Sequence, residues 1–427
     1  MSDSPNQDCT THAARNSRVI RLPIEENEYA NVVDDSTCFR SWLDDHYAQY
    51  PELFPGQFSA GYLMKDSFVS LKTGLLLRRI VVNNIAYSVR PSFVLPYLRK
   101  NVGIDVASNA LFLRKFSVPF WALAHVFGEY PMYWYRLESS LGRFSIVGTT
   151  VKSPDLLPSD IAADEKHTKA LGDKVYVATT VADECILGAE VSPSAGTQDL
   201  TDAYEVFKDE SRALDPKYQP KTVNTDGWNA TVSAFKALFP GIMLIQCFLH
   251  LYIKMRDRSK LKYRDLFLQV ADKFWNCYEA TSKRSFSQRV RRLFDWSINP
   301  DNELPDVLKK PISTLKAKLQ SFAGAYDHAG SHRTSNMLDR LMQRMDRHLF
   351  HSQYFHGKVV AANLGIRAWA LIYNFAPSNP RTVKKYGNKY VSPAERLNQK
   401  KYHNDWLQNL LISSSLQGGI GPQCASP

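Results

Sequence analysis

161-IAADE-165 and 222-TVNTD-226 are the two stretches that decide the fold we expect for this chain. Each is a short run of apolar or β-branched residues that ends in a carboxylate, which is typical of a buried strand with a polar end. Between them the pattern predicts strands over 174–181 and 185–191, a turn at 182–184 and a helix over 197–214. Beyond them it predicts a helix over 228–239 and a strand over 242–248.

The order of these elements is three strands, helix, strand, helix, strand, which is the layout of a ribonuclease H-like α/β sheet. A long basic helical stretch over about 250–325 interrupts this order. The fold is predicted to resume with a helix within 333–350 and a hydrophobic helix over 356–375. We therefore expect an RNase H-like catalytic domain over 160–376 with a large all-α insertion.

Three aspartates lie where this frame can bring them together: Asp164 and Asp226 at strand ends, and Asp339 on a helix. Phosphodiester chemistry needs divalent cations on the attacking and leaving oxygens, and a few carboxylates can hold them. Mg²⁺ suits such a site, with Mn²⁺ as a substitute. Because neighbouring side chains on a strand point to opposite faces, only one of Asp164 and Glu165 can belong to the site, and we assign Asp164.

Four stretches that carry these residues, taken in order, resemble the Mutator-like group of DDE/D transposases from bacterial insertion sequences: 163-ADEKH-167, 224-NTDGW-228, 247-CFLH-250 and 333-RTSNMLDR-340. The resemblance covers roughly 160–375. It implies an enzyme that cuts DNA at the ends of an insertion sequence and transfers the freed 3′-OH into target DNA. It also implies that Asp164, Asp226 and Asp339 are the catalytic, metal-binding acids, although the third acid of that group is more often Glu.

Cys247 and His250 form a Cys-x-x-His pair directly after the strand that follows Asp226. In the transposases that the chain resembles, this histidine assists the active site, so His250 is a candidate catalytic residue. A second interpretation is structural, with Cys247 packed as a small apolar residue and His250 bonded to the backbone. A third is a zinc site in which His328 and His332 complete a Cys-His₃ set.

The N-terminal third shows a different pattern. Residues 1–37 are polar and acidic, and we expect a mobile tail. Over 38–150 we expect a mainly helical DNA-binding region with a helix-turn-helix near 109–140, in which Tyr133 and Arg136 reach the major groove. Within it, the runs 75–82 and 85–90 are predicted to be two strands joined by a turn. A plain three-helix packing motif is the alternative. Residues 377–427 are predicted to form a basic loop and an amphipathic helix over 394–414.

Charge points to a polyanionic partner, since the formal net charge is +11 and residues 251–300 carry twelve Lys and Arg against five Asp and Glu. Arg289 and Arg292 lie on one helical face of this region and are candidate DNA contacts. Arg333 is another, although the segment around it, with Ser335 or Asn336, also fits a helix N-cap. Trp275 and Trp296 could stack on an unpaired base, but core packing is the favoured interpretation.

Six cysteines without paired spacing argue against a disulfide framework, and no apolar run approaches the ~20 residues that span a bilayer. The expectation is a cytoplasmic, nucleoid-associated transposase that acts on terminal inverted repeats and target DNA as a homo-oligomer, with no membrane partner. Two alternatives are a catalytically silent, transposase-derived DNA-binding protein and an RNase H-like nuclease without strand transfer.

Overall fold

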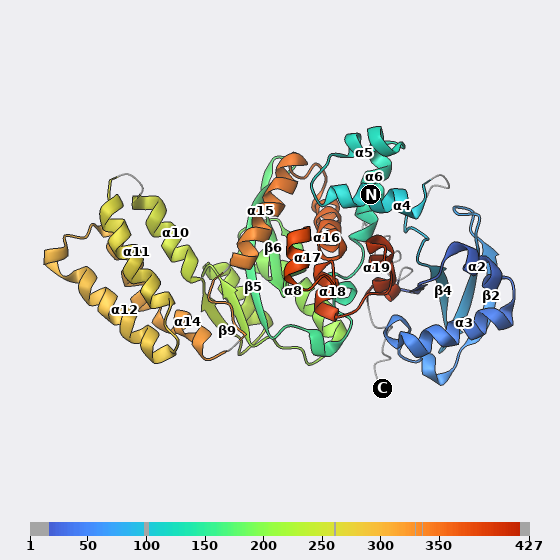
Figure 1. The fold of residues 1–427 in the computed structure, drawn as a ribbon, viewed down its shortest axis with the longest axis horizontal. Helices are drawn as coiled ribbons and strands as arrows, with labels where there is room; N and C mark the ends of the chain where they lie inside the picture. Colours follow the sequence, from blue (N-terminus) through green and yellow to red (C-terminus); the bar gives the residue numbers. More distant parts are fainter. Residues whose placement is uncertain (1–16, 98–101, 260–261, 329, 335, 419–427) are drawn as a thin grey trace, which may run out of the picture.

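The computed structural model describes residues 17–97, 102–259, 262–328, 330–334 and 336–418. The fold is mixed α/β, as predicted, and contains a five-stranded and a four-stranded sheet. Three parts follow one another along the long axis: a helical unit, a central α/β unit and a smaller sheet unit near the N-terminus (Figure 1).

The central sheet contains every strand predicted between 160 and 248. It has the order β7-β6-β5-β8-β9, in which β5, β6 and β7 are antiparallel and β8 and β9 run parallel to β5. The strands are β5 (Asp160–Ala170), β6 (Asp173–Ala182), β7 (Cys185–Ser192), β8 (Thr222–Thr225) and β9 (Met243–Gln246). β5 continues to Ala170, beyond the predicted end, because 166–170 pairs with β6 in a long hairpin.

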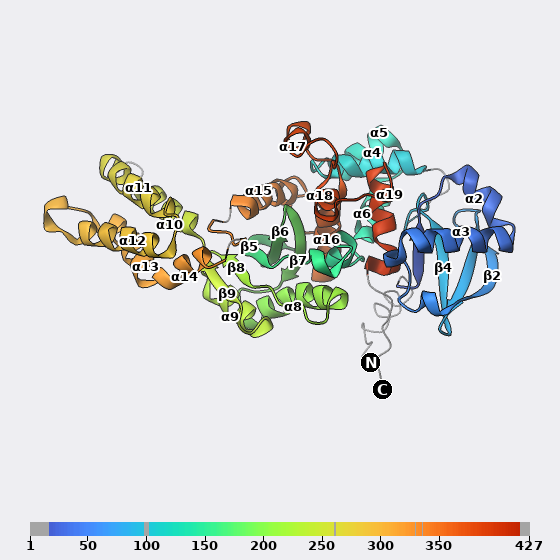
Figure 2. The same cartoon turned by 60° about the horizontal axis from the view of Figure 1, so that its bottom comes forward.

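Helices cover both faces of this sheet (Figure 2). One face packs against α8 (Thr197–Leu214) and α9 (Asn229–Leu238), and the other against α15 (Asn336–His351) and α16 (Val359–Phe375). Side chains along β5 alternate between the two cores: Ile161 and Ala163 face α8 and α9, and Ala162 faces α15 and α16. This alternation decides which face each carboxylate of β5 occupies.

Arg367 of α16 joins the two layers at the β7 edge of the sheet. Its guanidinium donates to Glu190 of β7 at 2.5 Å and to Glu210 of α8, and also to the carbonyl oxygens of Gly142 and Phe144. Only about a tenth of each of the three charged side chains is exposed. One cation therefore neutralises two mostly buried carboxylates, of which Glu210 also accepts a hydrogen bond from the backbone N–H of Val147.

The helical unit lies between β9 and α15 in the sequence and has its own core, built around Phe248, Phe274 and Phe286. Trp275 packs against Tyr252, and Trp296 packs on the same core, which confirms the core-packing interpretation of both. The helices are α10 (Phe248–Ser259), α11 (Arg264–Tyr278), α12 (Lys283–Ile298), α13 (Asp306–Ala317) and α14 (Leu319–Ala323). α14 contacts β9, so this unit adjoins the end of the central sheet.

The N-terminal region differs from the prediction. Residues 19–91 form a sheet of order β1-β4-β3-β2 covered by two helices, so this stretch is not mainly helical. The hairpin of β3 and β4 confirms the two strands predicted over 75–82 and 85–90. The expected mobile tail over 1–37 is wrong for 17–37, and its remainder, 1–16, lies outside the described residues. Ile20 and Leu22 are completely buried, while the exposed acids that follow them hid this pattern in the sequence. The elements are β1 (Val19–Leu22), α2 (Glu26–Val33), α3 (Ser36–Gln49), β2 (Leu63–Val69), β3 (Leu76–Val82) and β4 (Ile85–Pro91).

Three helices occur where the helix-turn-helix was predicted: α4 (Ile104–Arg114), α5 (Phe120–Phe127) and α6 (Pro131–Leu141), followed by α7 (Ile146–Thr150). The second helix of the expected motif, α6, packs on α16, with Trp134 and Leu137 completely buried. A buried ion pair between Arg114 and Glu138 also ties α6 to α4. These contacts are those of the alternative, a helical packing motif.

The C-terminal segment is part of the core. The single helix predicted over 394–414 is two helices, α18 (Pro393–Asn398) and α19 (Trp406–Ser413), separated by Gln399 with a left-handed φ of 52°. α19 is buried and contacts β1, α4, α7 and α16, so it connects the two sheet units. Short 3₁₀ helices complete the described part: η1 (Pro51–Leu53), η2 (Phe58–Ala60), η3 (Pro154–Leu156), η4 (Pro300–Asn302), η5 (Gly324–Tyr326) and η6 (Ser415–Gly418).

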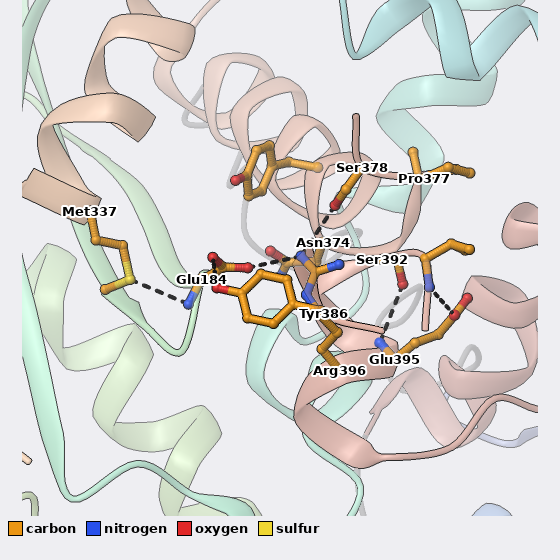
Figure 3. A network of polar contacts seen from close by, with 12 residues as sticks. Glu184, Met337, Asn374, Pro377, Ser378, Tyr386, Ser392, Glu395 and Arg396 are labelled. Carbon is orange, nitrogen blue, oxygen red and sulfur yellow. Dashed lines mark hydrogen bonds and ion pairs between the residues drawn. The ribbon is translucent and has the colours of Figure 1, made fainter. Parts of the chain in front are cut away.

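The turn between β6 and β7 anchors both α15 and the C-terminal segment (Figure 3). Glu184 accepts hydrogen bonds from Tyr386, just after α17 (Pro380–Lys385), and from Arg396 of α18, at 2.7 and 2.9 Å. Its backbone N–H also donates to Met337 Sδ on the first turn of α15. The start of α15, and with it Asp339, is therefore fixed relative to the sheet. No helix in the described parts is long and apolar enough to cross a membrane.

Arg367→Met is expected to lower the free energy of unfolding by about 3–5 kcal/mol, because it leaves Glu190 and Glu210 buried and uncompensated. Urea denaturation measures the change. Arg79→Met is the matched control, since Arg79 pairs with Asp66 on the surface and its loss should cost less than about 1 kcal/mol. Equal effects of the two substitutions would contradict the linking role of Arg367.

Candidate metal site

Asp164 lies in β5, two residues after Ala162, so its side chain points to the same face of the sheet as that of Ala162, the face that packs against α15 and α16. Glu165 occupies the opposite face, where its Oε1 accepts hydrogen bonds from Tyr204 of α8 and Thr231 of α9 at 2.7 and 2.5 Å. Burial raises the pKa of Glu165 to about 7, although the two hydroxyl donors oppose this shift. The structure thus confirms that Asp164 and Glu165 point to opposite faces and that Glu165 faces covering helices.

Asp164, His250 and Asp339 meet at one place. One ligand atom from each lies within 4.8 Å of the other two, and this is the only such group of three or more His, Cys, Asp or Glu found in the described parts of the chain. β5 supplies the first residue, the first turn of α10 the second and the first turn of α15 the third. Residues far apart in the sequence therefore converge on the α15 face of the sheet.

Burial and charge govern the protonation of this cluster. Burial, and then the nearby carboxylate of Asp226, raise the pKa of Asp164 to about 6. A hydrogen bond with Cys247 is the largest factor that raises the pKa of His250 to about 9, and the charges of Asp164 and Asp339 add to it. At neutral pH, without a cation, a protonated His250 thus offsets part of the negative charge of the two aspartates.

Asp226 follows β8 and lies beside this group without belonging to it. Its Oδ1 accepts a hydrogen bond from the backbone N–H of Trp228 at 2.7 Å, across a turn in which Gly227 has a φ of 85°. A side chain at Gly227 would also collide with Gln246, since its Cβ would lie 2.4 Å from Nε2. This turn aims the carboxylate close enough to Asp164 to raise its pKa.

The arrangement suits a divalent cation. Carboxylate oxygens are the ligands that Mg²⁺ and Mn²⁺ prefer, and a neutral imidazole can serve as a further ligand. A cation between Asp164 and Asp339 would supply the positive charge that a proton on His250 supplies otherwise, and ligand residues release protons when a metal binds. The described donors that fit are Asp164, Asp339 and His250, with Asp226 adjacent.

The zinc set is not formed. Cys247, His250, His328 and His332 all lie in the described part of the chain, but they are not brought within the spacing of a shared ion. Cys247 is buried and forms a hydrogen bond with His250. The backbone carbonyl of His332 accepts a hydrogen bond from the side chain of Asn224. His250 therefore lies in the cluster with Asp164 and Asp339, and Cys247 is its buried hydrogen-bond partner.

Asp226 and several basic side chains line one cavity of about 300 Å³. Its walls include exposed basic side chains from two helices of the helical unit: Lys254 and Arg258 on α10, and Lys310 on α13. Lys318, at the residue that follows α13, extends this wall. Sequence reasoning missed these residues. Lys254 and Arg258 are one helical turn apart on α10, so the sequence could place them on one helical face but not in this cavity.

The residues predicted to bind DNA fall in different environments. Tyr133 is only 3% exposed and packs in the core, so its predicted contact with DNA is wrong. Arg136 is exposed and bonded to Tyr97, and it lines a cavity beside the N-terminal sheet rather than the site of the aspartates. Arg289 donates to the carbonyl of Asn276 on the helical unit, and Arg292 is exposed on the same helix.

Arg333 has a structural position. Its guanidinium donates to the carbonyl of Tyr278 at 3.0 Å and to the hydroxyl of Tyr326, and it lies over both rings. It thus fastens the segment before α15 to the helical unit. The predicted N-cap falls on Ser335, which lies outside the described residues, or on Asn336, whose side chain the structure does not describe.

Comparison with known proteins gives no family for this chain: no protein-family model matches it, and no curated protein matches it. The function assigned to this protein therefore depends on the geometry of its site.

In metal-free buffer, Asp164→Asn is expected to stabilise the protein at pH 7.5. The pKa of Asp164 is raised from 3.8 to about 6 on folding, so its contribution to stability is present below pH 4 and is lost as the pH rises to 6. One pKa unit corresponds to about 1.4 kcal/mol, so the gain at pH 7.5 is about 1–3 kcal/mol. Urea denaturation with a chelator should show almost no gain at pH 4.

Asp155→Asn, at an exposed acid in η3, is the matched control for this measurement and should change little. Added Mn²⁺ should stabilise the wild type more than Asp164→Asn, because only the wild type keeps the full ligand set. A loss of stability in Asp164→Asn at pH 7.5 would instead make this carboxylate a structural hydrogen-bond acceptor.

Proposed function

We propose that this protein is a metal-dependent transposase with an RNase H-like catalytic unit, which cuts DNA at insertion-sequence ends and transfers the 3′-OH to target DNA. The observation that carries the proposal is the convergence of Asp164, Asp339 and His250 within 4.8 Å, with Asp226 beside them. Four separate stretches of the sequence supply these four residues. A chance cluster of surface acids would not be expected to bring residues from four separate stretches together.

The architecture supports the same proposal. The strand order β7-β6-β5-β8-β9, with three antiparallel strands and two parallel ones, is the layout expected of an RNase H-like sheet. Asp164 lies on β5, the first strand of this sheet, and Asp226 follows β8, its fourth strand in sequence. Asp339 lies on α15, the helix after the helical unit. In this interpretation α10 to α14 are the all-α insertion.

The charge around the site favours DNA as the substrate. Lys254, Arg258 and Lys310 line the same cavity as Asp226, and the net charge of the chain is +11. Phosphate groups held by these cations would lie next to the carboxylates, so that the insertion positions the substrate strand. The protein is expected to act as a nucleoid-associated homo-oligomer, because two element ends must be joined in one complex.

The residues of the chain then have separate tasks. Asp164 and Asp339 would hold a Mg²⁺ or Mn²⁺ ion, and Asp226 would complete the acidic set for two-ion chemistry. Bound ions would supply the activation of the attacking oxygen and the stabilisation of the leaving oxygen. His250 balances the charge of the carboxylates before ions and DNA bind, and Cys247 holds its orientation through their hydrogen bond.

Asp226→Asn and Asp339→Asn are each expected to reduce Mn²⁺-dependent cleavage of DNA carrying the element ends more than about 100-fold, since even indirect supports of metal ligands cost 10–100-fold. DNA binding should persist, because each change removes negative charge near a phosphate. A gel shift and a cleavage assay on the same DNA measure both. The control is Asp346→Asn, on the same helix as Asp339, which breaks only a partly exposed pair with Lys166 of β5.

A strand-transfer assay with a precut 3′-OH end separates transposition from simple hydrolysis. Joined products support the proposal, and cleavage without joining would identify a nuclease. Cleavage that persists in both Asp226→Asn and Asp339→Asn would overturn the site. DNA binding without any metal-dependent cleavage in the wild type would identify a silent DNA-binding protein.

Lys254→Ala combined with Lys310→Ala should weaken DNA binding and make it less dependent on salt. Each phosphate contact contributes about 0.9 to the slope of log affinity against log salt concentration, so two lost contacts reduce the slope by about 2. Fluorescence anisotropy with a labelled duplex at several salt concentrations measures the slope. The control removes the same charge elsewhere, with Lys65→Ala and Lys236→Ala, and should leave the slope nearly unchanged.

A further inference from the structure

A second basic cavity lies on the other side of the molecule from the helical unit, between the N-terminal sheet and α6. It has a volume of about 630 Å³, which is large enough for a nucleotide and much larger than a single ion needs. Five Arg and Lys residues line it and no described Asp or Glu does: Arg21, Lys72, Arg90, Arg136 and Arg143. The charged groups of its described walls are therefore all positive.

Arg21 and Arg90 form the inner wall. They lie on the paired strands β1 and β4, and their Cα atoms are register partners. Arg21 is only 4% exposed, and its guanidinium donates to the carbonyl of Val94 at 2.8 Å. The Nε of Arg90 is buried without any hydrogen-bond partner in the described structure.

Two adjacent arginines without a carboxylate are costly in a folded protein. Burial, and then the charge of Arg90, lower the pKa of Arg21 to about 9, and burial also lowers the pKa of Arg90. Buried charges are normally paired, and an unmet buried donor loses its hydration without compensation. In the ion pair of Arg114 with Glu138 and in the Arg367 cluster, the same protein does pair its buried guanidinium groups.

The outer wall adds cations that remain accessible. Lys72 follows β2, Arg136 lies on α6 and Arg143 follows α6, and all three are exposed. Hydroxyl groups of Tyr97, Ser139 and Ser140 lie among them. An anion bound at the inner wall would therefore contact the planar guanidinium donors of Arg21 and Arg90. Further negative charges on the same ligand would contact the outer cations.

We propose that this cavity binds the phosphate groups of a nucleotide-sized ligand, with Arg21 and Arg90 as the primary contacts and Arg136 at its mouth. The ligand is either a segment of nucleic-acid backbone or a free nucleotide, since both present linked phosphates. The cavity is separate from the acidic site, and phosphate binding does not depend on the proposed function. Only the nucleic-acid source rests on that function.

Arg90→Gln tests the proposal in the full chain without divalent cations. Sodium pyrophosphate should raise the melting temperature of the wild type in a saturable way at constant ionic strength. Loss of one charge-assisted contact should weaken the pyrophosphate affinity of Arg90→Gln about 10- to 100-fold. Arg79→Gln, on the neighbouring strand β3 with an exposed partner, should keep wild-type affinity.

A second variant guards against misfolding. Arg136→Gln lies on the exposed mouth, so it should fold normally and weaken pyrophosphate binding less than Arg90→Gln does. Without ligand, Arg90→Gln should melt at the same temperature as the wild type or higher, because it removes an uncompensated charge. If pyrophosphate stabilises Arg90→Gln as well as the wild type, or stabilises neither, the proposal is overturned.

A labelled DNA duplex of arbitrary sequence identifies the source of the phosphate. Competition by pyrophosphate together with weaker DNA binding by Arg90→Gln supports nucleic-acid backbone. Pyrophosphate binding that Arg90→Gln weakens while DNA binding is unchanged supports a free nucleotide. In a protein that binds pyrophosphate but no DNA, the cavity is supported and the transposase proposal fails, so the two failures are distinguishable.

Discussion

The structure depends on how Arg367 holds the two helical layers around one sheet. This single guanidinium links α16 to β7 and α8, and it reaches the chain between α6 and α7 through two carbonyl oxygens. α16 in turn contacts α6, α18 and α19 on its other sides. Because an arginine keeps its charge even when buried, this link cannot relax by losing a proton, and it holds α16 on the face of the sheet that α15 also covers.

Once that face is fixed, the chemistry of the cluster follows from strand parity. Asp164 must lie under α15, and Glu165 must lie under α8 and α9, where two hydroxyl groups satisfy it. The anchor at Glu184 then places the first turn of α15 so that Asp339 reaches Asp164.

The same convergence sets the protonation of the cluster. Burial together with neighbouring carboxylates raises the pKa of Asp164, and the bond to Cys247 together with the charges of Asp164 and Asp339 raises the pKa of His250. Both shifts reduce the net negative charge of the cluster, one by protonating Asp164 and the other by protonating His250, and a bound dication would make these protons unnecessary.

The sequence predicted the central sheet and the position of Asp164. The central strands combine β-branched runs with turn residues, and alternation along β5 separates Asp164 from Glu165. It predicted the hairpin of β3 and β4 in the N-terminal sheet but not β1, since β1 is four residues long and is followed by exposed acids. Nor could it assign the arginines, because only tertiary packing places Arg258 in the cavity that Asp226 lines and Arg333 against two tyrosine rings.

Acidic and basic groups are separated in a way that suits a polyanionic substrate. A cluster of carboxylates alone would repel a polyanion, whereas the cations of α10 and α13 that line the same cavity as Asp226 would let the phosphate of the proposed DNA substrate approach. These cations belong to a unit with its own core, joined to the sheet near β9 and fastened by Arg333 before α15. The segment that carries Asp339 is therefore also fastened to the unit that carries the basic side chains, and under the proposed function this would couple metal binding to substrate positioning.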